Sequence, residues 1–271
     1  MASSSPGRRW WRWALLPPIA FVAWLLALWP TPSWYRTHWP AETAFMRMRR
    51  AQAPLFGDSG RRERRYTPVP LERIASAMPL AAVTGEDANF FEHDGIDYEA
   101  IRKAMGYRRA TFDWRAPRDR AELRRALGRA WDRRDALRGA STITQQLAKN
   151  LYLSPSRNPL RKLKEAVTAY RLEHALGKRR IIELYLNVAE MGNDIWGVEA
   201  ASRTYFRKPA ASLSRPEAAA LAGLLPVPLR SNPQLKPGRM RWRQQLILRR
   251  MAGERLEIPR TEKDIPDTAG L

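Results

Sequence analysis

The chain contains no cysteine and only three histidines, His38, His93 and His174, which stand far apart. The lack of cysteine excludes disulfides, thiolate metal sites and a cysteine nucleophile. Because the histidines are scattered, a histidine-built metal centre is not expected either. Acidic residues are also scarce, since 27 Asp and Glu face 48 Lys and Arg and leave a net charge of +21. This balance predicts an anionic partner, which can be nucleic acid, an anionic lipid surface or a phosphorylated substrate.

Long apolar runs are missing except close to the N-terminus. The stretch from Ala14 to Trp29 carries no charge and follows a set of arginines, Arg8, Arg9 and Arg12. About 20 apolar residues are needed to cross a bilayer, and tryptophans at both ends suit its interfaces. Pro17 and Pro18 lie in the first part of the stretch, where lost backbone donors cost least.

Residues 1–30 are therefore predicted to be a cytoplasmic tail and a single-pass transmembrane signal anchor, which is uncleaved because no small-residue cleavage site follows. The arginines are expected to stay in the cytoplasm, which sends later residues to the outer, periplasmic face of the cell (inner) membrane. The alternative is a buried helix of a soluble protein. An outward-facing domain has little nucleic acid to meet, so the positive charge is better matched to lipid headgroups or a lipid-linked phosphate.

Helical signals dominate the rest of the chain, and no run of alternating strand residues is convincing. Apolar residues recur at spacings of three and four, as in Ile181, Leu184 and Val188. The sequence predicts a mostly α fold, with a connector at 31–65 that holds a short helix around Phe45, a folded domain at 66–255 and a loose tail at 256–271. Residues 108–138 are rich in arginine and only sparsely apolar, which predicts an exposed helix or inserted flap.

The run from Gly85 to Asp97 packs an acid pair, two aromatics and a histidine into a short segment. A carboxylate beside Phe90 and Phe91 would lose hydration, and desolvation favours the protonated form of an acid. Such a carboxylate can accept and return a proton near neutral pH. Glu86 is therefore the leading candidate for a catalytic base. The alternative is an acidic loop whose aromatics belong to the core.

A second polar cluster runs from Gly139 to Asn150. Helical spacing sets Ser141, Gln145 and Lys149 on one face, with Thr142, Gln146 and Asn150 beside them and Ile143, Leu147 and Leu151 able to face the core. A stripe of hydrogen-bonding groups that ends in a cation suits a sugar hydroxyl or a phosphate. The alternative is a capping box of Thr142 and Gln145 that opens an ordinary amphipathic helix, and both interpretations can hold at once.

A cationic cluster follows around the lone acid Glu165, and its members are Arg157, Arg161, Lys162 and Lys164. Such a cluster can hold a pyrophosphate, and its charges are expected to keep Glu165 ionised. Two carboxylates in opposed environments are typical of divided acid and base roles. The alternative is a helix-surface salt bridge between Arg161 and Glu165, which are four residues apart.

Taken together and in this order, these segments resemble the peptidoglycan glycosyltransferases of glycosyltransferase family 51. Arg161 to Glu165 continues into a helical block that ends Ile182-Glu-Leu-Tyr-Leu-Asn187. Two later stretches agree with the family, namely Gly192 to Lys208, and Leu213 to Pro226 followed by Asn232-Pro233. The resemblance covers residues 71–251, and five ordered motifs are far more specific than one short pattern.

The resemblance implies a lysozyme-like, two-lobed helical domain that lies against the membrane and polymerises lipid II into glycan strands. By position, Glu86 matches the general base, which takes the proton of the acceptor GlcNAc 4-hydroxyl as it attacks the donor MurNAc C1 with inversion. Glu165 matches a second catalytic glutamate near the departing undecaprenyl pyrophosphate. The matched substrate-binding positions are Asp87, Phe90 and His93 around the base, and Ser141, Thr142, Gln145, Gln146, Lys149, Asn150, Arg157, Arg161, Lys162 and Lys164 around the donor.

Two departures from the bifunctional members of the family indicate its monofunctional branch. Ala140 stands where many bifunctional members have a second glycine, and the Ser-x-x-Lys and Lys-Thr-Gly motifs of a transpeptidase are absent. No cofactor is expected to be required. A divalent cation, Mg or Mn, can stimulate the reaction without being essential, because lysines can neutralise a pyrophosphate themselves.

The expected partners are lipid II, the lipid-linked glycan strand, the membrane, and a transpeptidase with divisome or elongasome proteins, but no nucleic acid. Two other functions stay open at this point. A lysozyme-like lytic transglycosylase or hydrolase would share the fold and the solitary glutamate, although it has no pyrophosphate to bind. The other is a noncatalytic basic protein that binds a membrane or nucleic acid, and only the high positive charge supports this function.

Overall fold

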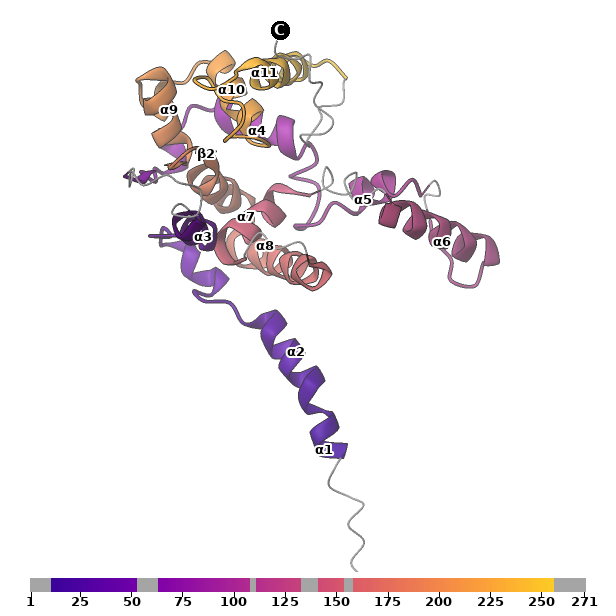
Figure 1. Cartoon of the computed structure of the whole chain (residues 1–271). Coiled ribbons are helices and arrows are strands. Elements are labelled where there is room, and N and C mark those ends of the chain that lie inside the picture. Colours follow the sequence, from indigo (N-terminus) through magenta and orange to yellow (C-terminus); the bar gives the residue numbers. More distant parts are fainter. Residues whose placement is uncertain (1–10, 53–62, 108–110, 133–140, 154–157, 256–271) are drawn as a thin grey trace, which may run out of the picture.

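The computed structural model describes residues 11–52, 63–107, 111–132, 141–153 and 158–255, and it is mostly helical (Figure 1). The prediction of a mostly α fold is therefore confirmed. The segments of the Arg-rich region at 108–110 and 133–138, the cation Arg157 and the predicted tail at 256–271 lie outside the described residues.

The core of the fold is a cluster of five helices that come from distant parts of the chain. They are α4 (Ala77–Glu86), α7 (Ile143–Tyr152), α8 (Pro159–Val188), α10 (Arg215–Leu224) and α11 (Gly238–Met251). The apolar face of α7 is buried as its spacing predicts, because Ile143, Leu147 and Leu151 all lie in the hydrophobic core. Gly223 allows α10 to approach α11 closely, since a Cβ at this position would lie 2.8 Å from the Met240 carbonyl oxygen.

A small sheet lies beside α9 (Val198–Phe206), and its strands are only two or three residues long. It consists of β1 (Arg65–Tyr66), β2 (Glu190–Gly192) and β3 (Ile195–Trp196) in the order β1-β3-β2. Strand β3 pairs in parallel with β1 and antiparallel with β2. Because β2 follows directly after α8, the sheet fixes the direction in which the chain leaves that long helix. Short 3-10 helices at Pro32–Arg36 (η2), Leu71–Arg73 (η4) and Ala210–Ser212 (η6) complete the connections.

Two helices project away from the helical cluster, α5 (Tyr98–Ala104) and α6 (Pro117–Asp132), which together form the α5–α6 arm (Figure 1). Asp97 begins α5 by accepting a hydrogen bond from the Ala100 amide with its side chain. Helix α6 carries the Arg-rich sequence, and its Leu127 side chain is exposed. Residues 117–132 are therefore helical, and over 117–128 Asp119 and Ala126 are buried while the other side chains are half-buried or exposed.

The N-terminal apolar stretch forms α1 (Trp11–Ala14) and α2 (Leu16–Leu26), which extend away from the rest of the molecule (Figure 1). Pro17 and Pro18 lie in the first turn of α2, where helices tolerate them. No residue of α2 is buried, and its C-terminal end contacts α8 through Lys164, whose ammonium group donates to the Trp24 carbonyl oxygen at 2.6 Å. In the part of the chain that the structure describes, no helix combines the length and the apolar character needed to span a membrane.

The segment predicted as a connector contains the expected short helix, α3 (Ala44–Gln52). Thr43 lies just before it and accepts a hydrogen bond from the Met46 amide with its hydroxyl oxygen. Met46 is buried, and α3 packs against α7. The helix is thus attached to the core next to the polar residues of α7.

Candidate active site

Glu86 is the last residue of α4, and its carboxylate is almost completely buried among polar partners. The guanidinium of Arg243, from α11, donates from Nη2 to Glu86 Oε1 at 2.7 Å. The side-chain amide of Gln146, from α7, donates to Glu86 Oε2 at 3.1 Å. Three helices that are distant in sequence therefore converge on this carboxylate and fix its orientation.

The network continues from Gln146 to Tyr185 of α8. The Tyr185 hydroxyl donates to Gln146 Oε1 at 3.2 Å, which orients the Gln146 amide so that its nitrogen faces Glu86. Tyr185 is fully buried, and burial raises the pKa of its phenol well above the ordinary value, with the charge of Glu86 adding to the effect. Tyr185 therefore remains a protonated donor at the pH values at which the protein works.

The aromatic surroundings expected for Glu86 are present only in part. Phe90 is fully buried in the core, but Phe91 is 69% exposed and packs on Phe90 with its edge. The Glu86 carboxylate instead contacts Arg243 and Gln146, so its environment includes a buried cation as well as apolar groups. The sequence did not predict this environment, because both partners are distant from Glu86 in sequence.

Asp87 and His93 form the connection between the end of α4 and the beginning of α7. His93 Nδ1 accepts from the Gly95 amide at 3.2 Å, so its Nε2 carries the proton that faces Asp87 Oδ1 at 3.1 Å. Asp87 Oδ2 also accepts from the Ile143 amide at 2.9 Å, which places a carboxylate at the N-terminus of α7. These two predicted residues therefore connect the end of α4, which carries Glu86, with the start of α7.

Thr142 and Gln145 form the capping box that begins α7, as the alternative interpretation of this segment proposed. The Gln145 amide donates to Thr142 Oγ1, and the Thr142 amide donates to Gln145 Oε1, both at 3.1 Å. Both residues are buried, and Thr142 also donates from Oγ1 to the Gly95 carbonyl oxygen at 2.6 Å. Ser141 lies before the helix and accepts from the Lys162 ammonium group at 2.8 Å.

The side chains that reach the pocket from α7 are Gln146, Lys149 and Asn150, all three of which belong to the predicted polar stripe. Lys149 is half-buried, and its ammonium group lies 6.0 Å from the centre of the Phe45 ring. Burial lowers the pKa of Lys149 from its ordinary value, and the carboxylates of Glu165 and Glu86 oppose that shift. Lys149 thus interacts electrostatically with both predicted catalytic carboxylates.

Glu165 is buried on α8 and pairs with two cations from the preceding turn. Arg161 Nη1 lies 2.7 Å from Glu165 Oε2, and the ammonium group of Lys162 contacts Glu165 Oε1. The predicted salt bridge and the predicted cationic surroundings therefore occur together. Lys164 is different, because it contacts α2 instead of this cluster, with its ammonium group 4.6 Å from the centre of the Trp24 ring.

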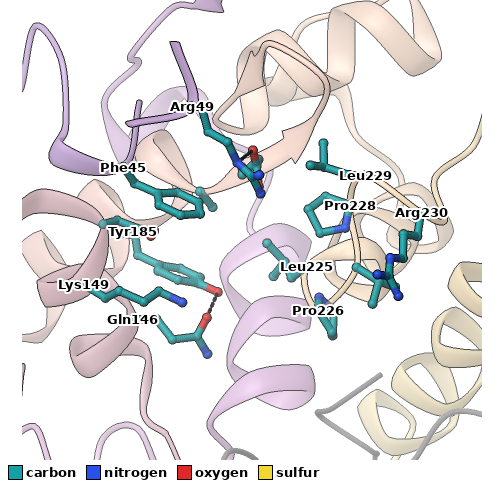
Figure 2. Close-up of a pocket in the computed structure, with 14 residues that line it drawn as sticks. Phe45, Arg49, Gln146, Lys149, Tyr185, Leu225, Pro226, Pro228, Leu229 and Arg230 are labelled. Atoms are coloured by element: carbon teal, nitrogen blue, oxygen red, sulfur yellow. Dashed lines mark hydrogen bonds and ion pairs between the residues drawn. The ribbon is translucent and has the colours of Figure 1, made fainter. Parts of the chain in front are cut away.

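A pocket of about 450 Å³ lies beside this network (Figure 2). One wall comes from α7, α8 and α3, and the opposite wall comes from the segment after α10. Gln146 lines the pocket and also contacts Glu86, so it connects the pocket to the buried carboxylate. The remaining lining residues are Phe45, Arg49, Lys149, Asn150, Tyr185, Ala189, Glu190, Leu225, Pro226, Val227, Pro228, Leu229 and Arg230.

Sequence reasoning did not assign Arg243, Phe45, Arg49 or Glu190 to the site, nor Tyr185, Ala189 and residues 225–230. Arg243 had a detectable signal, because it lies on the same helical face as two buried apolar residues, Met240 and Ile247, at spacings of three and four. An arginine on an apolar face needs a buried partner. Phe45 and Arg49 gave no such signal, since they lie in the segment interpreted as a connector. Within the described ranges, no cluster of three or more metal-ligating side chains occurs.

The site thus combines a buried carboxylate and a half-buried lysine at the edge of a polar pocket in a helical fold. A Transglycosylase family model matches residues 54–115 and 117–252. The chain therefore belongs to the transglycosylase family.

Relatives named biosynthetic peptidoglycan transglycosylase align with most of the chain. The Bordetella pertussis protein is 41% identical over 248 residues, which cover 91% of this chain and 93% of that protein. The Azoarcus protein is 39% identical over 246 residues, which cover 86% of this chain and 96% of that protein. The Shewanella frigidimarina protein is 47% identical over 165 residues, which cover 61% of this chain and 63% of that protein.

Proposed function

We propose that this chain is a monofunctional peptidoglycan glycosyltransferase, which polymerises lipid II into glycan strands at the cell envelope. The family match and the names of the relatives support this activity. The structural observation that carries the mechanism is the arrangement of Glu86 and Lys149 around Gln146. A buried carboxylate and a partly desolvated cation lie next to the same pocket, and such a pair suits proton removal at one end of a bond and charge neutralisation at the other.

In the proposed reaction, Glu86 accepts the proton of the GlcNAc 4-hydroxyl of the acceptor. That oxygen forms a bond to the MurNAc C1 of the donor, the bond from C1 to the pyrophosphate oxygen breaks, and the configuration inverts. A carboxylate has about four lone-pair positions. Arg243 and Gln146 use one position on each oxygen of Glu86, which leaves acceptor capacity for the hydroxyl proton.

Lys149 is proposed to neutralise the departing undecaprenyl pyrophosphate. Its lowered pKa results from burial, and a buried ammonium group binds an anion more strongly than a hydrated one does. Glu165 is proposed to orient Arg161 and Lys162 on the donor side, because it contacts both cations. A divalent cation is expected to assist this charge neutralisation without being required.

The fold is proposed to have the two lobes of a lysozyme-like enzyme, with the α5–α6 arm as part of the smaller one. The apolar N-terminal helices are proposed to anchor the chain in the inner membrane with the catalytic domain outside. The exposed apolar side chains of α2 support this placement, among them Ile19, Val22 and Leu26. Lipid II, the growing strand and a transpeptidase of the cell-wall machinery are the proposed partners.

Incubation of the purified full chain with labelled lipid II tests the activity. We expect long products that lysozyme digests to muropeptides, together with release of undecaprenyl pyrophosphate. A lytic enzyme would instead release soluble fragments from finished peptidoglycan. Release of fragments without elongation of lipid II would refute the proposed function and favour the hydrolase.

A further inference from the structure

Helix α3 forms part of the pocket wall although it lies before residue 54, where the family match begins. It supplies Phe45 and Arg49, and the strand β2 supplies Glu190, which pairs with Arg49. Figure 2 shows the Phe45 ring beside the Tyr185 ring and the Arg49 side chain above the opening between the two walls. A segment that served only to connect an anchor to a domain would not need to reach the pocket.

Arg49 holds Glu190 in a fixed orientation through two contacts. Arg49 Nε lies 2.8 Å from Glu190 Oε1, and Arg49 Nη2 donates to Glu190 Oε2 at 2.9 Å. The guanidinium also lies over the Phe45 ring, 5.1 Å from its centre, and the Phe45 ring packs with its edge on Trp196 at 5.8 Å. The three side chains are therefore mutually positioned before any ligand enters the pocket.

The chemistry of this wall suits a neutral polyhydroxyl ligand better than an anion. The charges of Arg49 and Glu190 balance each other, while Lys149 provides the cationic position elsewhere in the same pocket. Arg49 Nη2 occupies one acceptor position on Glu190 Oε2, and Arg49 Nε lies near Oε1 without a hydrogen bond, so the remaining lone pairs of both oxygens can accept hydrogen bonds from hydroxyl groups. The side chain of Glu190 is 10% exposed, which limits competition from water.

We propose that Phe45, Arg49 and Glu190 form a carbohydrate subsite, in which Glu190 accepts hydrogen bonds from the hydroxyl groups of a sugar ring in the lipid-linked substrate. This subsite rests on the proposed function. Glu190 and Lys149 both line this pocket. A sugar whose phosphate contacts Lys149 would therefore have its ring in the pocket that Glu190 also lines. Arg49 is a positioning residue here, because it acts by orienting Glu190.

The test measures KM and kcat for labelled lipid II with the full chain in detergent. Glu190→Gln keeps the shape of the side chain but removes its charge and one acceptor oxygen. We expect its KM to rise about tenfold or more, which corresponds to the loss of one hydrogen bond to a charged group. Arg50→Gln is the control. Arg50 follows Arg49 on α3, but its side chain is exposed and pairs with Glu42 instead of Glu190. Its KM should equal that of the wild type.

A charge swap separates recognition from stabilisation. The double variant Arg49→Glu, Glu190→Arg retains an ion pair, so its melting temperature should recover relative to either single variant. Its KM should remain high, because the carboxylate no longer lies where the sugar needs an acceptor. Recovery of KM together with the melting temperature would show that the pair only ties α3 to the domain.

The outcomes distinguish the two proposals. A wild-type protein that elongates no lipid II refutes the proposed function, and the subsite falls with it. A wild-type protein that elongates lipid II, with Glu190→Gln within about twofold of its KM, refutes the subsite alone. The single variant decides the question even where the double variant does not fold.

Discussion

The ion pair between Glu86 and Arg243 predicts that the proposed catalytic base is also important for stability. The Arg243 side chain has no exposed surface and that of Glu86 is 4% exposed, with 2.7 Å between Nη2 and Oε1. Glu86→Gln removes the charge opposite a buried guanidinium, and removal of one partner of a buried pair costs about 3–5 kcal/mol. For a domain of this size, we expect the melting temperature to fall by about 2–4 °C for each kcal/mol.

The same substitution should lower polymerisation by about 10²- to 10⁴-fold, because an amide cannot accept the proton. Adding Arg243→Met removes the buried charge that the Glu86 carboxylate balanced, so the double variant should regain stability but not activity. The two readouts thus separate the electrostatic role of Glu86 from its proposed chemical role. Arg249→Met is the control, since Arg249 also lies on α11 but forms an exposed pair with Glu254, and it should change neither readout much.

Thermal and urea unfolding of the wild type, the single variants Glu86→Gln and Arg243→Met, and the double variant would give the coupling between the two residues. Elongation of labelled lipid II would give the activity. If Glu86→Gln were as stable as the wild type, the argument from the buried ion pair would be wrong. If it retained more than about a tenth of the wild-type rate, Glu86 would not be the general base.

Three further predictions follow from individual contacts. Burial lowers the pKa of Lys149 below its ordinary 10.5, so the charged form of this side chain costs stability at neutral pH. Lys149→Met should therefore melt at a higher temperature than the wild type but elongate lipid II poorly. In thermal scans, this difference in melting temperature should shrink as the pH rises from the lowered pKa towards 10.5. Thr142→Ala deletes the capping-box acceptor of α7 and should cost about 1–2 kcal/mol in urea unfolding, and an unchanged midpoint would contradict the cap. Gly197→Ala places a Cβ 2.2 Å from the Asn187 carbonyl oxygen at a φ of +80°, so circular dichroism should report an unfolded or strongly destabilised protein, whereas a native melting curve would show that the backbone can shift there.

The sequence predicted those features that depend on near neighbours. The capping box of Thr142 and Gln145 and the buried face of α7 follow from spacings of three and four residues, and both are present. Gln146, Lys149 and Asn150 of the predicted polar stripe line the pocket, whereas Gln145 takes part in the cap that begins the helix.

Features that depend on distant partners could not be predicted in this way. Arg243 is separated from Glu86 by 157 residues, and Arg49 is separated from Glu190 by 141. Periodicity shows that a side chain is buried, but it does not show which side chain it meets. The strands were also missed, because elements of two or three residues are too short to show alternation.

The chain leaves the helical cluster for the α5–α6 arm and returns to it at almost the same place. Thr142 donates to the Gly95 carbonyl oxygen at 2.6 Å, and the Ile143 amide donates to Asp87 at 2.9 Å, so the two ends of the excursion are fastened together beside Glu86. The entropy of closing a loop grows slowly, by about 0.6 kcal/mol for each doubling of its length. A change in the length of the segment between these two ends should therefore leave the contacts of Thr142 and Ile143 in place. This makes the α6 region suitable for a spectroscopic label or an inserted reporter domain.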